Sequence, residues 1–169
     1  MTFHVGEKVV YPNQGVGTIE NISMRSFGTR PERFYLLRLA TNHLTVMVPF
    51  SHVGDVGLRK VTKNGQVERV LRFLAQGECK GCRDWKNRFK ANSEKMRSGE
   101  LMGVAEVLKG LLLLRRKKPL SFREKKMLDK ARHMLIMEVS ISRALHEAEA
   151  VRLLQDSLAK ADLELPSAM

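Results

Sequence analysis

The spacing of the hydrophobic residues changes once along this chain, and that change limits its fold more than any other feature. In residues 1–60, short hydrophobic runs alternate with polar residues and are separated by turn-forming residues, a pattern typical of β-strands. From about residue 66 onward, hydrophobic residues recur three and four positions apart, which indicates amphipathic helices. We therefore expect an α+β protein with two domains, a β domain at residues 1–62 and an all-α helical bundle at residues 63–169.

The β part contains four or five short predicted strands, at residues 8–12, 16–25, 34–39, 44–48 and 58–61. Alternate residues of a strand share a face, so Leu44, Val46 and Val48 should point one way, and their neighbours the other. Gly17 inside a strand indicates a bulge or a close approach of the backbone. Because so few strands cannot form a sandwich, we expect a small Tudor- or SH3-like β-barrel.

The helical part contains five predicted helices, at about residues 66–76, 85–97, 101–116, 122–145 and 148–161. A linker is predicted at residues 77–81. Asp84 is a candidate N-cap, and Ser121 and Glu124 have the spacing of a capping box. The hydrophobic stripes of these helices should pack together as the core of one compact bundle.

The charge of the chain is strongly positive. It carries 30 Lys and Arg residues against 18 Asp and Glu residues, a formal net charge of +12, and residues 80–132 hold seventeen basic and six acidic residues. This excess favours a polyanionic partner, either a nucleic acid or an anionic membrane surface. The hydrophobic stretch 101–114 is too short to span a bilayer, and the N-terminus has no apolar signal-peptide core, so we expect a cytoplasmic protein without a membrane anchor.

No motif of an enzyme is present in the sequence. It has no phosphate-binding loop, zinc-protease His pair or nucleophile elbow, and its five histidines lack metal-ligand spacing. We therefore expect no catalytic activity, cofactor or metal. Cys79 and Cys82 form a Cys-x-x-Cys pair, but a zinc site needs two more ligands and a thioredoxin-like couple needs a βαβ context. The pair is interpreted as two reduced thiols in a linker.

Trp85 is the only tryptophan and stands at the predicted start of a helix, followed by Lys86, Arg88 and Lys90. An aromatic residue at a helix end among cations can stack on or wedge beside an unpaired base, while the cations hold phosphates. The alternative is that Trp85 packs inside the bundle, for example against Phe89. The residues alone leave both interpretations open.

Two groups of basic residues flank Pro119. They are Arg115, Arg116, Lys117 and Lys118 before it, and Arg123, Lys125, Lys126, Lys130 and Arg132 after it. Cations at a helix end also complement the helix dipole, but their density favours contact with phosphates, which position a protein without reading bases. Because the sequence has no recognition-helix pattern, we expect little base specificity.

Six motifs of the chain resemble, in order, those of one known family. They are FHVGEKVVYPNQG at residues 3–15, LTVMVP at 44–49, VGLR at 56–59, WKNRFKAN at 85–92, AEV at 105–107 and LSFREKKMLDKAR at 120–132. Together they extend over nearly the whole chain and resemble the CarD/CdnL family of bacterial RNA polymerase-binding transcription regulators.

The resemblance implies a division of roles between the two domains. Residues 1–62 would form a Tudor-like domain that binds the β subunit of RNA polymerase, a module shared with the transcription-repair coupling factor. Residues 63–169 would contact promoter DNA at the upstream edge of the transcription bubble, largely without sequence specificity, with Trp85 wedged into the minor groove. The protein would be a monomeric, non-enzymatic regulator that stabilises the promoter open complex and associates with the nucleoid through the polymerase.

The resemblance also identifies candidate contact residues. The positions that match DNA-contacting residues are Trp85, Arg88, Lys90 and Lys125, with Lys86 added because it is adjacent. The positions that match the polymerase-binding surface are Arg25, Leu44, Thr45, Val46 and Met47. Some relatives carry an arginine where this chain has Met47, so an ion pair to the polymerase would be missing here.

Two other functions fit the residues. Residues 6–10 and 16–19 are weakly similar to the short barrel motif of some ribosomal and elongation proteins, which would suit an RNA-binding or ribosome-associated protein. The basic composition would also suit a nucleoid protein that binds duplex DNA without polymerase. The first alternative leaves the segment 85–90 without a role, and the second predicts that the chain ignores polymerase.

Overall fold

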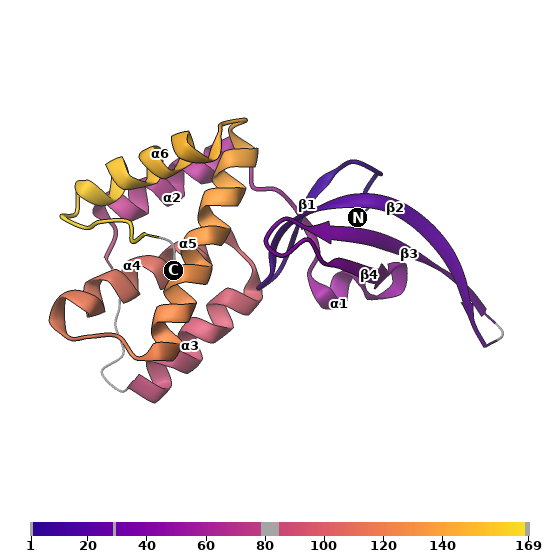
Figure 1. Cartoon of the computed structure of the whole chain (residues 1–169), viewed down its shortest axis with the longest axis horizontal. Coiled ribbons are helices and arrows are strands. Elements are labelled where there is room, and N and C mark those ends of the chain that lie inside the picture. Colours follow the sequence, from indigo (N-terminus) through magenta and orange to yellow (C-terminus); the bar gives the residue numbers. More distant parts are fainter. Residues whose placement is uncertain (1, 29, 79–84, 168–169) are drawn as a thin grey trace. The chain divides into compact units, whose positions relative to one another are not determined.

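The computed structural model describes residues 2–28, 30–78 and 85–167, with Phe27, Trp85 and Lys86 described by their backbone alone (Figure 1). Contacts within the chain divide it into two compact units, Met1–Val61 and Thr62–Met169. An antiparallel sheet forms the first unit, and helices form the second. The chain is therefore an α+β protein, as the hydrophobic spacing predicts.

One sheet of five strands organises the described part of the first unit. The strands are β1 (Lys8–Tyr11), β2 (Gly15–Phe27), β3 (Arg30–Leu39), β4 (Thr45–Pro49) and β5 (Arg59–Lys60). Their order is β4-β3-β2-β1-β5, and every neighbouring pair is antiparallel. β2 and β3 form a long curved hairpin (Figure 1), and the short helices η1 (Phe50–His52) and α1 (Val53–Val56) connect β4 to β5. Within the described residues no ladder joins β4 to β5, so the sheet remains open at its edges.

One face of the sheet carries the hydrophobic core of this unit. Ile19 and Leu37 lie opposite each other on β2 and β3, and both are fully buried. The hydroxyl oxygen of Tyr35 accepts a hydrogen bond from the backbone N of Phe3 at 3.1 Å, and its ring stacks on Phe50 with centroids 4.2 Å apart. Burial of these large side chains is the main stabilising contribution on this face.

Gly17 marks a close approach of the backbone. A β-carbon at this position would lie 2.7 Å from Cδ1 of Leu37 and 2.9 Å from the carbonyl oxygen of Arg38. The irregularity in the β2–β3 register lies further along, between Ile19 and Asn21. The bulge and the close backbone approach that a strand glycine can indicate therefore occur at separate places. Glycine is required at position 17 because there is no space for a β-carbon.

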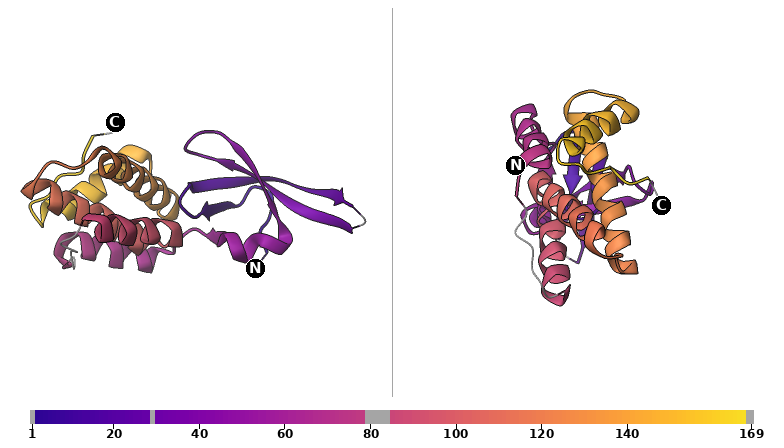
Figure 2. Two further views of the ribbon diagram at one scale, coloured as in Figure 1. Left: turned by 90° about the horizontal axis from the view of Figure 1, so that it is seen from below. Right: turned by 90° about the vertical axis from the view of Figure 1, so that its left-hand side faces the viewer.

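The second unit is a bundle of helices. They are α2 (Asn64–Gln76), α3 (Trp85–Ser98), α4 (Leu101–Lys117), α5 (Phe122–Ser142) and α6 (Glu147–Ala159). The predicted stripes form one core, to which α4 contributes Leu108 and Leu111, and α6 contributes Leu154 and Leu158, all fully buried. α6 lies along α2 (Figure 1), and Figure 2 shows the helices gathered as a bundle rather than a flat layer. No helix in the described ranges has the length and apolar character needed to cross a membrane.

The helix boundaries differ from the predicted ones by one to three residues, and two of the differences have a local cause. α2 begins at Asn64, because Lys63 is its N-cap and residues 64–65 form its first turn rather than a separate turn. α5 ends at Ser142, because Ala144 adopts the left-handed backbone conformation with a φ of 52°, which a continuing helix cannot contain.

Three sequence predictions fall outside the described residues: the N-cap role of Asp84 and the two linker thiols, Cys79 and Cys82. Among the side chains that the structure does describe, no group of three or more His, Cys, Asp or Glu residues is placed to hold a metal ion.

Candidate functional site

A buried ion pair joins the first turns of α3 and α5. Nε of Arg88 in α3 donates a hydrogen bond to Oε2 of Glu124 in α5 at 3.1 Å, and the two side chains are 11% and 5% exposed. By comparison, the side chains of the ion pair between Lys95 and Glu106 are 40% and 36% exposed. Because the first pair is largely shielded from water, it fixes the two helix ends against each other.

Glu124 also forms the capping box predicted from the sequence. Its backbone N donates a hydrogen bond to Oγ of Ser121 at 3.2 Å, and the backbone N of Ser121 donates to Oε1 of Glu124 at 3.5 Å. One carboxylate oxygen therefore caps α5, while the other accepts the hydrogen bond from Arg88. The helix dipole adds to this arrangement, since it stabilises a negative charge at a helix N-terminus.

Phe122, the first residue of α5, is an exposed aromatic side chain that the sequence prediction missed. It is 66% exposed, and Nζ of Lys126 lies 4.7 Å from its ring centroid. The neighbouring Arg123 places its guanidinium 5.9 Å from the ring centroid of Phe89 in α3. An aromatic residue four positions before a lysine at a predicted helix start is the signal that could have identified this pair.

The other predicted DNA-contacting residues lie around this junction. Lys125 is exposed in the first turn of α5. Lys90 is exposed on α3, two residues after Arg88, and so projects from a different side of the helix. Trp85 is the first residue of α3, and Lys86 is the second. Their side chains lie outside the described set, so both interpretations of Trp85 stay predictions.

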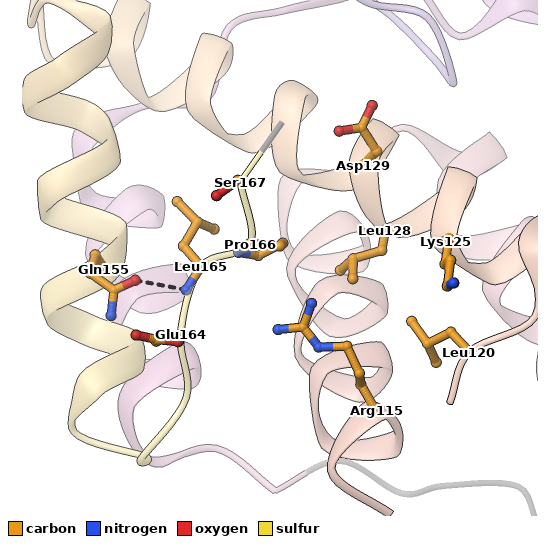
Figure 3. Close-up of a pocket in the computed structure, with 10 residues that line it drawn as sticks. All are labelled: Arg115, Leu120, Lys125, Leu128, Asp129, Gln155, Glu164, Leu165, Pro166 and Ser167. Carbon is orange, nitrogen blue, oxygen red and sulfur yellow. Dashed lines mark hydrogen bonds between the residues drawn. The ribbon is translucent and has the colours of Figure 1, made fainter. Parts of the chain in front are cut away.

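A cavity of about 520 Å³ opens beside Lys125 (Figure 3). Arg115 extends into it from α4, Leu128 lines it from α5, and Leu165 closes one side from the C-terminal segment. That segment is held in place by a hydrogen bond of 2.7 Å from the backbone N of Leu165 to Oε1 of Gln155. The cavity thus brings together one cation from each of the two basic groups that flank Pro119.

Four of the predicted polymerase-binding residues, at 44–47, lie on or next to β4, an edge strand of the sheet, and Arg25 lies on β2. The register of the strands places Arg25, Thr45 and Met47 on one face. Leu44 precedes the strand and is 59% exposed, whereas Val46 points to the opposite face and packs against the hydrophobic core. Four of the five residues therefore belong to the outer surface, and Val46 supports them from the core.

Known proteins match this chain over both units. The family model described as "CarD-like/TRCF RID domain" matches residues 3–62, and that described as "CarD, C-terminal domain" matches residues 69–155. YdeB of Bacillus subtilis (strain 168), by its name a candidate transcription factor, is 33% identical over 147 residues, which are 87% of this chain and 96% of YdeB. The solved structure of CdnLNt from Myxococcus xanthus is 39% identical and covers 36% of this chain and 86% of that chain, with a TM-score of 0.32.

The two family models follow each other along the chain in the order of its sequence motifs, the first on the sheet and the second on the helices. The relationship to YdeB spans nearly the full length of both proteins. The chain therefore belongs to the CarD/CdnL family.

Proposed function

We propose that this chain is a non-enzymatic transcription regulator that binds the β subunit of bacterial RNA polymerase and stabilises the promoter open complex. Family membership indicates the coarser part of this function, a transcription regulator that interacts with RNA polymerase. The role at the open complex is supported by one observation, that the joined ends of α3 and α5 present an exposed aromatic ring among exposed cations. The candidate wedge, Trp85, begins α3 at this same end.

The outer face beside β4 suits the docking of another protein. On its outer side, β4 has no ladder with any described strand, and such an edge can pair with a strand of a partner. Arg25 adds an exposed positive charge on the face that also carries Met47. Since Met47 stands where some relatives have a charged arginine, Arg25 should carry the larger share of the electrostatic contact in this protein.

The end of α5 suits the phosphate backbone of DNA and an unpaired base. Arg123, Lys125 and Lys126 are all exposed there, and contacts of such cations with phosphates do not depend on base sequence. Phe122 lies among them with most of its surface exposed, and an aromatic ring can stack on a base that has lost its pairing partner. Such a base is present only after the duplex has opened.

Selective binding to the opened duplex is what stabilises the open complex. A regulator shifts an equilibrium only by binding one state more tightly than the other, and phosphates are present in both states. Stacking of a base on an aromatic ring contributes about 1–3 kcal/mol, which corresponds to about a five- to 150-fold shift. Binding to polymerase raises the local concentration of the DNA-binding part, so that this contribution takes effect at the promoter.

Charge reversal on the two faces of the sheet tests the polymerase contact. Arg25→Glu should weaken binding of the purified chain to RNA polymerase and to its isolated β subunit. Arg33→Glu reverses an exposed charge on the other face and should leave this binding unchanged. Arg33→Glu should keep the wild-type melting temperature because its side chain is exposed, whereas Arg25→Glu places a second carboxylate opposite Glu32 on β3 and should lower it only slightly. Equal retention of wild type and Arg25→Glu on immobilised polymerase would contradict the assigned surface.

A further inference from the structure

Arg88 does not have the surroundings of a residue that contacts phosphates. Its side chain is only 11% exposed, and its Nε donates to Oε2 of Glu124 at 3.1 Å. Lys90, two residues further along the same helix, is exposed. With 11% of the side chain exposed, little of the guanidinium is open to a phosphate while its Nε stays on Glu124, whereas the Lys90 side chain is exposed.

Both carboxylate oxygens of Glu124 accept hydrogen bonds. Oε1 accepts hydrogen bonds from the backbone N and Oγ of Ser121, at 3.5 and 3.2 Å, and Oε2 accepts from Arg88. The Glu124 side chain is 5% exposed, so withdrawal of Arg88 would leave a buried carboxylate without its cation. That state is strongly unfavourable, and Arg88 therefore stays on Glu124 in the folded protein.

The ion pair acts on the turn of helix that contains Trp85. Arg88 lies three residues after Trp85, so both belong to the first turn of α3. The next residue, Phe89, is also in contact with α5, through the guanidinium of Arg123 at 5.9 Å from its ring centroid. Two consecutive residues thus attach this turn to the N-terminal end of α5.

We propose that Arg88 is a positioning residue: through Glu124 it holds the first turn of α3 and so fixes where Trp85 is presented, and it does not itself contact phosphate. The effect of this positioning on promoter DNA rests on the proposed function. The effect on Trp85 in the free protein is independent of the proposed function.

Fluorescence of the free protein tests the effect on Trp85, because this is the only tryptophan in the chain. Arg88→Met and Glu124→Gln should both lower the steady-state anisotropy of Trp85. Glu94→Gln removes an exposed carboxylate from α3 and should leave the anisotropy at the wild-type value. Glu124→Gln should keep the capping box, because glutamine can replace glutamate in it. Arg88→Lys keeps the cation, so its anisotropy should lie between those of Arg88→Met and the wild type. These two variants distinguish loss of the ion pair from unfolding. Wild-type anisotropy in Arg88→Met and Glu124→Gln would overturn the proposal.

Binding of labelled duplex DNA at a series of salt concentrations tests the second half of the proposal, without polymerase. Lys90→Met should reduce the slope of log K against log salt by about one, as expected for the loss of one phosphate contact. Arg88→Met should leave the slope unchanged, and Glu124→Gln should strengthen binding no more than Glu94→Gln does. The double variant Arg88→Met/Glu124→Gln should also keep the wild-type slope, because neither residue contacts phosphate in this proposal.

The opposite pattern would identify Arg88 as a phosphate contact. In that case Arg88→Met would reduce the slope by about one, and Glu124→Gln would release the arginine and tighten binding well beyond Glu94→Gln. If the wild-type chain does not lengthen the life of the open complex, the proposed function fails. The anisotropy and salt-slope measurements would still decide whether Arg88 positions Trp85.

Discussion

Nζ of Lys109 lies 2.6 Å from the carbonyl oxygen of Gly77, so a cation from α4 completes the C-terminal end of α2. The same Nζ donates to the carbonyl oxygen of Phe73 at 2.8 Å and lies 5.1 Å from the centroid of the Phe73 ring. Lys109 is 3% exposed. Since the last carbonyl groups of a helix carry a partial negative charge, this buried lysine has a structural role.

Lys109→Met should destabilise the helical unit, because methionine retains an apolar side chain of similar length but cannot donate to the two carbonyl groups. A hydrogen bond that involves a charged group contributes about 1.5–3 kcal/mol, so we expect the free energy of unfolding to fall by about 2–3 kcal/mol. Denaturant unfolding followed by circular dichroism measures this change. Lys95→Met, which removes a much more exposed ion pair with Glu106, should cost less than about 1 kcal/mol. An equal, small effect of both substitutions would contradict the structural role.

Phe122→Ala should weaken binding to DNA that contains unpaired bases. Its exposed ring can stack on such a base, which contributes about 1–3 kcal/mol. Binding to fully paired duplex should change little, because the flanking cations remain. Fluorescence anisotropy of a labelled forked DNA and of its fully paired counterpart measures the affinity of each protein for both DNAs. Phe122→Tyr keeps an aromatic ring and should retain binding to the fork. Wild-type affinity of Phe122→Ala for the fork would exclude this contact.

Lys130 should make the stability depend on alkaline pH. Burial lowers the pKa of Lys130 below its ordinary value of 10.5. The unfolded chain therefore holds this proton more tightly than the folded chain, and the charge of Lys130 opposes folding at neutral pH. That penalty fades as the pH rises through the lowered pKa toward 10.5.

The variant Lys130→Met, which cannot titrate, isolates this effect. Its stability relative to wild type should be greatest at pH values well below the lowered pKa and should decline as the pH approaches 10.5. Melting temperatures of both proteins across this range measure the difference. A difference that is constant or increases with pH would contradict the pKa shift.

Local sequence patterns were sufficient to predict most of the fold. All five predicted strand runs correspond to strands, because alternation with a period of two depends only on neighbours within each run. The capping box of Ser121 and Glu124 was predictable for the same reason, since its two residues are three positions apart. Helix ends were less predictable, and the left-handed conformation of Ala144 that follows α5 has no clear sequence signal.

Contacts between helices that are distant in sequence could not be predicted in this way. Arg88 and Glu124 are 36 positions apart, as are Phe73 and Lys109. Periodicity indicates which face of a helix is buried, but not which residue of another helix covers it. Arg88 therefore resembled a surface cation in a basic segment, and Lys109 resembled an interruption in a hydrophobic one.

The lifetime of the promoter open complex tests the proposed function most directly. The measurement uses purified RNA polymerase on a promoter whose bubble collapses readily, with the wild-type chain or Trp85→Ala at concentrations that saturate the polymerase. We expect the wild-type chain to lengthen the lifetime and Trp85→Ala to lose this effect while it binds polymerase as tightly. A lifetime lengthened equally by both proteins would contradict the wedge, and no effect of the wild-type chain would contradict the proposed function as a whole.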